Sequence, residues 1–270
     1  MATPIGNLGD VTARAKAILA AADLIACEDK RVTGKLLRHL GIKRPLTSYH
    51  DHSDARVRDD LIARAGREVV ALVSDAGTPM ISDPGFKLVR AARAAGVSVV
   101  TVPGPSAAIA ALTLAGLPTD RFLFAGFLPN KSKARRDVAS ELAGVRATLI
   151  FYDTGPRIGA SLADLAEVLG PREAAVAREL TKLHEECVTG TLAELAARYA
   201  DAPPKGEIVL VVAPPLDAAP VALDDAAIDA ALRALLVEMP PSKAARDLAR
   251  RHGLDRDRVY ARAVAIKDER

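Results

Sequence analysis

The stretch Val69-Val-Ala-Leu-Val-Ser-Asp-Ala-Gly-Thr-Pro-Met-Ile-Ser-Asp-Pro-Gly85 decides the fold class. Its first residues form a run of apolar, mostly β-branched side chains that predicts a buried strand over residues 69–74. The next eleven residues contain two glycines and two prolines, which specify a rigid turn. A helical pattern then runs from residue 86 to residue 95 and ends at Gly96, a residue type that commonly terminates helices. A strand, a tight turn and a helix in this order are typical of an α/β protein.

The pattern continues on both sides of this stretch. Residues 24–27 and 97–102 are predicted as further strands, separated by stretches of helical periodicity, and such alternation favours a parallel sheet. Residues 114–120 contain Gly116 and Pro118 and resemble a linker. We therefore expect a first α/β domain over residues 1–115.

A second α/β domain is predicted over residues 116–216. Its expected elements are a strand at 148–152, a helix at 158–169 stopped by Gly170-Pro171, a segment 173–178 that leads to a further strand, a helix at 191–199 and a last strand at 208–212. Pro214, Pro215 and Pro220 mark the next boundary.

Residues 220–270 are predicted to be a small helical tail. The expected helices are 224–238 with Asp224 near its N-cap, 243–252 with Ser242 as N-cap, and a third that begins at Asp255 and runs to about residue 266. A turn at Gly253 between two helices is typical of a helix-turn-helix, and a helical bundle with no nucleic-acid role is an equal alternative.

The composition sets limits on the class of protein. Half of the residues are apolar and 26% are charged, which is typical of a globular chain. No segment approaches the roughly 20 apolar residues that span a bilayer, and the first residues lack a signal-peptide pattern, so we expect a cytoplasmic protein. Cys27 and Cys187 are too few for a disulfide framework or a zinc site and are expected to be apolar side chains. The net charge of +3 permits a nucleic-acid partner without requiring one.

Three loops of small residues point to a ligand pocket. Ligands of open α/β sheets bind outside the carboxyl ends of the strands, where residues 75–85 and Pro103-Gly-Pro-Ser-Ala-Ala108 follow predicted strands. Asp75 and Asp83 can accept hydrogen bonds from an ammonium or a hydroxyl group. Each loop alone is compatible with an ordinary turn, but both together with Thr3-Pro-Ile-Gly-Asn7 predict a shared pocket. Neither a P-loop nor a Gly-x-Gly-x-x-Gly motif after a first strand is present, which argues against nucleotide hydrolysis and dinucleotide binding.

Eight short motifs occur in a characteristic order. They are Thr3-Pro-Ile-Gly-Asn7, Glu28-Asp-x-Arg31, His50-Asp-His52, Ser74-Asp-Ala-Gly-Thr-Pro79, Pro103-Gly-Pro-Ser106, Gly126-Phe-Leu-Pro129, Ala177-Arg-Glu-Leu-Thr-Lys182 and Lys205-Gly-Glu207. This series resembles the RsmI family, the small-subunit rRNA cytidine-2'-O-methyltransferases, which belong to the tetrapyrrole-methylase-like (class III) methyltransferases. The resemblance covers about residues 2–215, and the tail looks like the family's helical C-terminal domain. Departures from the pattern are Lys30 in place of threonine and Asp153-Thr-Gly-Pro156 in place of a segment that begins Glu-Ser.

The resemblance implies two α/β domains with S-adenosylmethionine in the cleft between them, a homodimer, and a 2'-O-methylcytidine product in 16S rRNA at the decoding centre of the small ribosomal subunit. The residues expected to line the cofactor are Pro4, Asp75, Gly77, Thr78, Ile81, Ser82, Ser106, Ala107, Tyr152 and Ala177. Two other functions stay open: methylation of a tetrapyrrole or corrin small molecule, and a non-catalytic ribosome-binding factor.

Glu28 and Asp29 are the first candidates for the chemistry, because they directly follow the predicted strand 24–27. We expect one of them to position or deprotonate the ribose hydroxyl, and the alternative is a carboxylate pair at a helix start. Glu179 and Lys182 are further candidates after a strand of the second domain. His50-Asp-His52 is either a second polar cluster or a surface loop, and two histidines do not make a zinc site, so no metal is expected.

RNA contacts are expected at the basic segment Lys131-Ser-Lys-Ala-Arg-Arg136 and at Arg31. Lys131, Lys133, Arg135 and Arg136 would hold phosphates, and the alternative is a solvated helix start. Residues 243–270 add nine basic against five acidic residues. Aromatic residues make up only 3% of the chain, so base stacking is not expected to be the main contact with RNA.

Only Met1 and Ala2 precede the first loop, where the family pattern has several extended apolar residues. The chain is therefore expected to begin inside or just after its first strand, and restoring upstream strand residues is expected to tighten cofactor binding.

Overall fold

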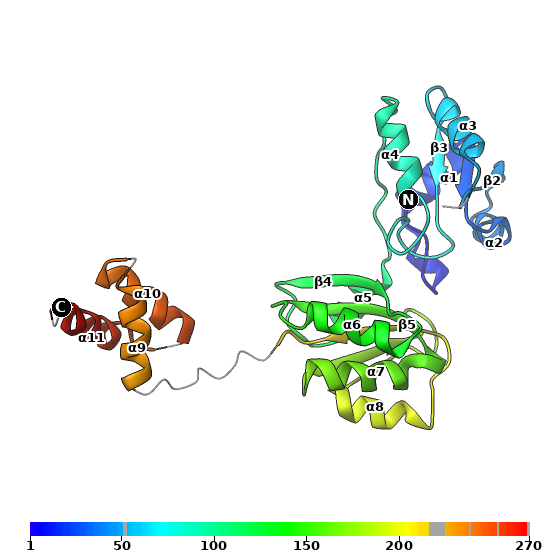
Figure 1. The fold of residues 1–270 in the computed structure, drawn as a ribbon. Coiled ribbons are helices and arrows are strands. Elements are labelled where there is room, and N and C mark those ends of the chain that lie inside the picture. Colours follow the sequence, from blue (N-terminus) through cyan, green and yellow to red (C-terminus); the bar gives the residue numbers. More distant parts are fainter. Residues whose placement is uncertain (51–52, 216–224, 238, 253, 269–270) are drawn as a thin grey trace. The chain divides into compact units, whose positions relative to one another are not determined.

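The computed structural model describes residues 1–50, 53–215, 225–237, 239–252 and 254–268. Contacts divide the chain into two compact units, Met1–Pro214 and Pro215–Arg270. The first unit contains a three-stranded and a five-stranded sheet, and the described part of the second unit is helical (Figure 1). None of the described helices is long and apolar enough to cross a bilayer.

The first sheet is parallel, as the sequence predicted. It consists of β1 (Leu24–Cys27), β2 (Leu46–Ser48) and β3 (Val70–Leu72) in the order β2-β1-β3. All four residues of β1 are buried, because helices cover both faces of this central strand. Side chains from α1 (Ala13–Ala21) and α2 (Lys30–Leu40) pack on one face, and side chains from α3 (Ala55–Ala65) and α4 (Phe86–Ala94) pack on the other.

The predictions around the opening stretch are confirmed with one exception. The strands at 24–27 and 69–74 and the helix that ends before Gly96 are present. The predicted strand at 97–102 is wrong, because this segment forms no ladder. Its backbone meets the short segment at the start of the chain, where Ala2 N donates to Val102 O at 3.1 Å. Valine-rich residues favour an extended backbone, but a strand also needs a neighbour long enough to pair with.

The second sheet has five strands in the order β4-β5-β8-β6-β7, and only the pair β4–β5 is parallel. The strands are β4 (Phe122–Phe127), β5 (Thr148–Thr154), β6 (Glu173–Arg178), β7 (Glu186–Thr191) and β8 (Glu207–Val212). The predicted strands at 148–152 and 208–212 are confirmed. Segment 173–178 is itself the strand β6, and the further strand expected after it is β7, whereas β4 was not predicted.

Helices cover both faces of this sheet (Figure 1). The small, apolar helix α5 (Ala107–Leu114) packs on one face through Ala108, Ala111 and Leu112. Side chains of α6 (Ser132–Leu142), α7 (Gly155–Leu169) and α8 (Leu192–Ala200) pack on the other face around Phe151. The predicted helices at 158–169 and 191–199 are therefore confirmed as α7 and α8.

The second unit consists of α9 (Asp225–Leu235), α10 (Pro241–His252) and α11 (Arg256–Asp268), which pack around an apolar core. Arg262 of α11 pairs with Asp229 of α9 at 2.8 Å. Ser242 lies inside α10 and is not its N-cap, because the fixed φ of Pro241 suits the first helical position. The predicted cap Asp224, the helix end at 238 and the turn at Gly253 lie outside the described residues.

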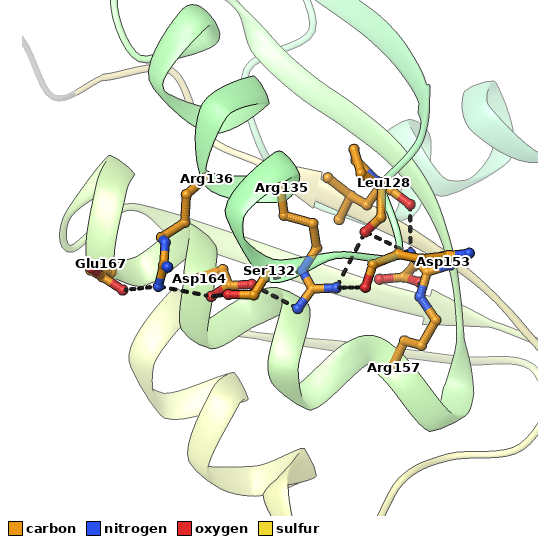
Figure 2. A network of polar contacts seen from close by, with 10 residues as sticks. Leu128, Ser132, Arg135, Arg136, Asp153, Arg157, Asp164 and Glu167 are labelled. Atoms are coloured by element: carbon orange, nitrogen blue, oxygen red, sulfur yellow. Dashed lines mark hydrogen bonds and ion pairs between the residues drawn. The ribbon is translucent and has the colours of Figure 1, made fainter.

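Two arginines hold the loop that follows β4 (Figure 2). Arg135 is only 5% exposed, and its guanidinium pairs with Asp164 at 2.7 Å and donates to Pro129 O and Asn130 O. Arg157 Nη2 donates to the carbonyl oxygen of Leu128. Since these carbonyls belong to consecutive residues, the arginines fix the backbone path from residue 128 to residue 130.

We predict that Arg135→Met lowers the free energy of unfolding by about 3–5 kcal/mol, because it leaves the buried carboxylate of Asp164 without its guanidinium. Arg136→Met is the matched control. Arg136 is 40% exposed, pairs with the exposed Glu167 at 3.1 Å and lies 3.6 Å from Asp164, which keeps its closer pair with Arg135 in this variant. Its loss should therefore change stability by less than about 1 kcal/mol. Urea denaturation of both variants measures the difference, and equal effects would contradict the structural role assigned to Arg135.

Candidate active site

A cavity of about 330 Å³ opens in the first unit, at the ends of strands from both sheets. Its wall is formed by the loops after β1, β3 and β6, by the start of α5, by the ends of β4 and β5, and by β8. The lining residues are Ile5, Glu28, Asp75, Ala76, Gly77, Thr78, Ile81, Ser82, Asp83, Ser106, Ala107, Phe127, Tyr152, Asp153, Glu179, Leu180, Lys182, Glu207, Ile208 and Val209.

Hydrogen bonds join the three loops that the sequence singled out. Thr3 and Gly77 form an antiparallel bridge, in which each backbone N–H donates to the other residue's carbonyl at 2.8 and 3.0 Å. Thr78 Oγ1 donates to Pro105 O at 3.0 Å. These contacts place the head of the chain, the loop after β3 and the start of α5 side by side at the cavity.

Strained backbone borders the cavity on two sides. Among the described residues, the non-glycine residues with positive φ are Met80, Ser82, Glu179 and Thr181. The first two lie in the loop after β3 and the other two in the loop after β6. A side chain in this conformation costs free energy, of order 1–3 kcal/mol, and such residues cluster at functional sites. The strain supports the assignment of this cavity as the functional site.

Two glycines allow close backbone approaches to the loop after β6. A Cβ atom on Gly6 would lie 2.6 Å from Lys182 Cγ and 2.8 Å from Leu180 O. A Cβ atom on Gly206, whose φ is +93°, would lie 2.6 Å from Glu179 Oε1. Glycine is therefore required at both positions for the cavity wall to close as observed.

The cavity is strongly acidic. Its lining includes the carboxylates of Glu28, Asp75, Asp83, Asp153, Glu179 and Glu207, against the single lysine Lys182. Lys182 is itself paired with Glu179 at 3.0 Å. Such a surface attracts a cationic ligand and repels phosphate groups.

Asp83 has the most perturbed carboxyl group of this set. Burial, followed by the negative charge of Glu28, raises its pKa from 3.8 to about 6, while a hydrogen bond with Ser74 opposes the shift. Asp75 and Glu207 add smaller contributions that also raise this pKa. A carboxylate with such a pKa is ionised at neutral pH and is a stronger base than an ordinary one.

An aromatic cluster forms the wall on the side of the second sheet. The ring of Tyr152 lies edge-on to Phe124 at 4.8 Å and to Phe127 at 5.3 Å between ring centroids. Burial raises the pKa of the Tyr152 hydroxyl, so it stays protonated at neutral pH.

Most of the residues expected to line the cofactor lie together in this wall. They are Asp75, Gly77, Thr78, Ile81, Ser82, Ser106, Ala107 and Tyr152. Pro4 is not part of the lining, where its neighbour Ile5 stands instead. Ala177 is fully buried in β6 under α5. Phe127, Glu207 and Val209 were missed, although the motifs Gly126-Phe-Leu-Pro129 and Lys205-Gly-Glu207 pointed to the first two.

The two carboxylates expected to act in catalysis occupy different environments. Glu28 lines the cavity. Asp29 does not, because its side chain caps α2 by accepting from Arg31 N at 2.7 Å and pairs with the Arg31 guanidinium at 2.6 Å. The hydrogen bonds from Arg31 lower the pKa of Asp29 to about 2, which makes it a weak base. His50 is exposed, and Asp51 and His52 lie outside the described residues.

The residues expected to hold RNA also separate into two groups. Lys131 and Lys133 are exposed, and Arg136 is partly exposed. The guanidinium of Arg135 is occupied inside the protein, so we remove Arg135 from the expected RNA contacts. Arg31 is 88% exposed but is paired with Asp29. No group of three or more metal-ligating side chains occurs among the residues that the structure describes.

Comparison with known families accounts for nearly the whole chain. The family of tetrapyrrole (corrin/porphyrin) methylases matches residues 2–196. The RsmI C-terminal HTH domain matches residues 222–267, which span α9, α10 and all but the last residue of α11.

Curated relatives match over the full length. A protein of Erythrobacter litoralis named ribosomal RNA small subunit methyltransferase I is 58% identical over 99% of this chain and 94% of its own length. Proteins with the same name from Mesorhizobium japonicum and Escherichia coli O157:H7 are 51% and 46% identical. They are covered over 91% and 92% of their lengths, and the matches span 99% and 97% of this chain.

Solved structures with lower sequence identity show the same fold. A diphthine synthase superposes with a TM-score of 0.61 at 18% identity, over 78% of this chain and 87% of its own. Uroporphyrin-III-C-methyltransferase from Thermus thermophilus gives 0.56 at 24% identity, over 78% of this chain and 91% of its own. These matches confirm the expected α/β methylase fold, and the family and full-length matches place the chain in a group: it belongs to the tetrapyrrole methylase family, among the ribosomal RNA small subunit methyltransferase I proteins.

Proposed function

We propose that this protein is a methyltransferase that uses S-adenosylmethionine to methylate the 2'-oxygen of a cytidine in 16S rRNA of the small ribosomal subunit. The observation that carries the proposal is the acidic cavity between strained loops, in a chain that matches rRNA methyltransferases along its whole length. The choice of cytidine, of its 2'-oxygen and of the decoding centre rests on the resemblance of the motifs. So do the proposed homodimer and the cytoplasmic location.

The cavity wall suits this cofactor. Ile5, Leu180 and Val209 offer apolar surface for an adenine ring. The first backbone N–H groups of α5, next to Ser106, have no partners within the helix. That of Ala108 donates to the Tyr152 hydroxyl, and the others can receive a carboxylate. When bound, S-adenosylmethionine supplies a methyl group on a positively charged sulfur, and the carboxylates in the wall favour that charge over a neutral sulfur compound.

A side chain of the cavity must also accept the proton of the ribose hydroxyl. The oxygen–carbon bond forms as the sulfur–carbon bond breaks, and the hydroxyl proton leaves to a base. Asp83 and Glu28 both line the cavity and can accept this proton on a carboxylate oxygen. A base in this position contributes about 10²–10⁴-fold to the rate. Asp29 is better assigned to positioning, because its backbone N–H donates to Asp75 Oδ1 at 2.9 Å.

The RNA phosphates require a separate surface, because the acidic cavity repels them. Lys131 and Lys133 at the start of α6 are exposed and carry the only basic charges of this segment that no described ion pair occupies. We propose that they hold the phosphates beside the target nucleotide.

A labelling experiment tests the proposed reaction. The protein is incubated with methyl-labelled S-adenosylmethionine and either small ribosomal subunits that lack the modification or a porphyrinogen. We expect label in 16S rRNA, recovered as 2'-O-methylcytidine after digestion, and none in the porphyrinogen. Label in the porphyrinogen alone would favour a small-molecule methylase, and cofactor binding without transfer to either would indicate a binding factor.

The pH dependence of the reaction tests the assignment of the base. If Asp83 is the base, kcat/KM rises about tenfold per pH unit below its pKa of about 6 and levels off above it. Asp83→Asn should lower kcat/KM by at least about 100-fold and remove this rise. If kcat/KM still rises with pH in Asp83→Asn but no longer does so in Glu28→Gln, the base is Glu28.

The folding of the Asp83 variant provides an internal control. Because burial raises its pKa above 3.8, the ionisation of Asp83 opposes folding, and stability is lost as the pH rises from about 4 through about 6. Asp83→Asn should therefore melt at a higher temperature than wild type at pH 8, and the difference should shrink at pH 4. A lower melting temperature at pH 8 would mean that the loss of activity reflects damage to the fold.

The salt dependence of binding tests the RNA surface. Lys131→Ala with Lys133→Ala should weaken binding to small subunits and reduce the slope of log K against log salt by about one to two. Lys16→Ala with Lys43→Ala is the control, because it removes two exposed lysines far from this segment in the sequence. Filter binding at several salt concentrations measures the slopes. Equal slopes for the two double variants would exclude Lys131 and Lys133 as phosphate contacts.

A further inference from the structure

Phe127 lines the cavity although 56% of its surface is exposed. A single exposed apolar side chain is common on a protein surface and needs no explanation by itself. What distinguishes Phe127 is that the backbone on both sides of it is built to hold the ring at the cavity.

Before Phe127, a bulge in β4 changes the direction of its side chain. The register between β4 and β5 shifts between Phe124 and Phe127, and Gly126 has a φ of +72°. In a regular strand, residues three positions apart point to opposite faces of the sheet. Here both rings contact Tyr152 from the same face. The bulge therefore aims Phe127 at the cavity, and the positive φ requires glycine at position 126.

After Phe127, the buried Arg135 and the partly buried Arg157 hold the chain (Figure 2). Leu128 N donates to Tyr152 O at 3.0 Å, and Leu128 O accepts from Arg157. Arg135 Nη1 donates to Asn130 O at 2.9 Å. With every successive carbonyl from residue 128 to residue 130 bound, the backbone that follows Phe127 is held in one path.

The charges of the site indicate what this ring contacts. Of the six carboxylates in the cavity lining, Glu179 pairs with Lys182 and Asp153 pairs with Arg157. The other four keep phosphate groups outside, so a nucleotide can present only its uncharged ribose and base to the cavity. A ribose within a structured RNA reaches such a cavity when its base leaves the stack, and the freed base then needs a new flat, apolar surface. Phe127 offers that surface on the exposed side of the wall, while Tyr152 lies half-buried behind it.

We propose that Phe127 is the platform on which the unstacked nucleobase of the target nucleotide rests while its ribose is methylated. This inference rests on the proposed RNA methylation and goes beyond it by assigning the contact that holds the base. It also refines the expectation drawn from the scarcity of aromatic residues: the phosphate contacts hold the RNA as a whole, and one aromatic ring holds the reacting nucleotide.

The test compares three variants in steady-state methylation of small ribosomal subunits that lack the modification. Phe127→Leu keeps an apolar side chain but removes the ring, and we expect the KM for subunits to rise about tenfold or more. Phe127→Trp keeps a flat ring and should restore a KM near the wild-type value. Phe122→Leu is the matched control, because Phe122 is 46% exposed on the same strand and lies outside the cavity lining, so its KM should not change.

Calorimetry with S-adenosylhomocysteine separates the base from the cofactor. The affinity of Phe127→Leu for S-adenosylhomocysteine should match that of wild type, which also shows that the cavity is folded. An unchanged KM in Phe127→Leu would overturn the proposal. So would a loss of S-adenosylhomocysteine affinity equal to the rise in KM, because the ring would then belong to the cofactor site. If wild type transfers no label to subunits, the proposed function itself fails and this inference fails with it.

Discussion

The close approach of Gly6 to the loop after β6 is the constraint on which the cavity depends. Any side chain at this position would overlap Lys182 and the carbonyl of Leu180, so the loop at the head of the chain could not lie against that wall. Gly206 leaves room for the side chain of Glu179 in the same loop. Within the loop, Glu179 and Thr181 adopt a left-handed backbone that costs free energy. The two glycines therefore leave room for a strained loop whose Glu179 and Leu180 lie in the cavity wall.

Acidic side chains predominate inside the cavity, and the basic side chains proposed to hold RNA lie outside it. The carboxylates inside favour a positively charged sulfur compound, and the same charges exclude the phosphates of an RNA. The basic side chains are therefore useful only outside the cavity, and the structure leaves fewer of them available than the sequence suggested. Arg135 is occupied by Asp164 and two carbonyls, so the basic segment 131–136 offers mainly its lysines. In the helical unit, Arg258 and Arg262 pair with aspartates of α9.

Arg135 and Arg157 show how a charged residue can serve a site that it does not touch. Arg135 and Arg157 lie among α6, α7 and the loop after β4, and Asp164 and Asp153 balance their charges. Such pairs gain little stability overall, since each charge must first lose its water. Their effect is geometric: they fix the carbonyls after Phe127 and with them the backbone path on that side of the residue.

The sequence by itself determined the fold class, the strands that precede the loops and most of the loops at the cavity. It could do so because apolar runs, glycines and prolines act locally: a valine-rich run forms a strand and Gly77 permits a tight turn regardless of what lies far away. It also identified the family, because its short motifs occur in the same order as the motifs of that family. Only the tertiary structure decided that residues 97–102 form no ladder, that Asp29 caps a helix, that Arg135 is buried and that Phe127 faces the cavity. The cap at Asp29 involves its near neighbour Arg31, and local sequence left it open beside a catalytic role. Each of the other three depends on a partner far along the chain or on a bulge that reverses a side chain, and residue type and spacing do not record what a side chain will contact after folding.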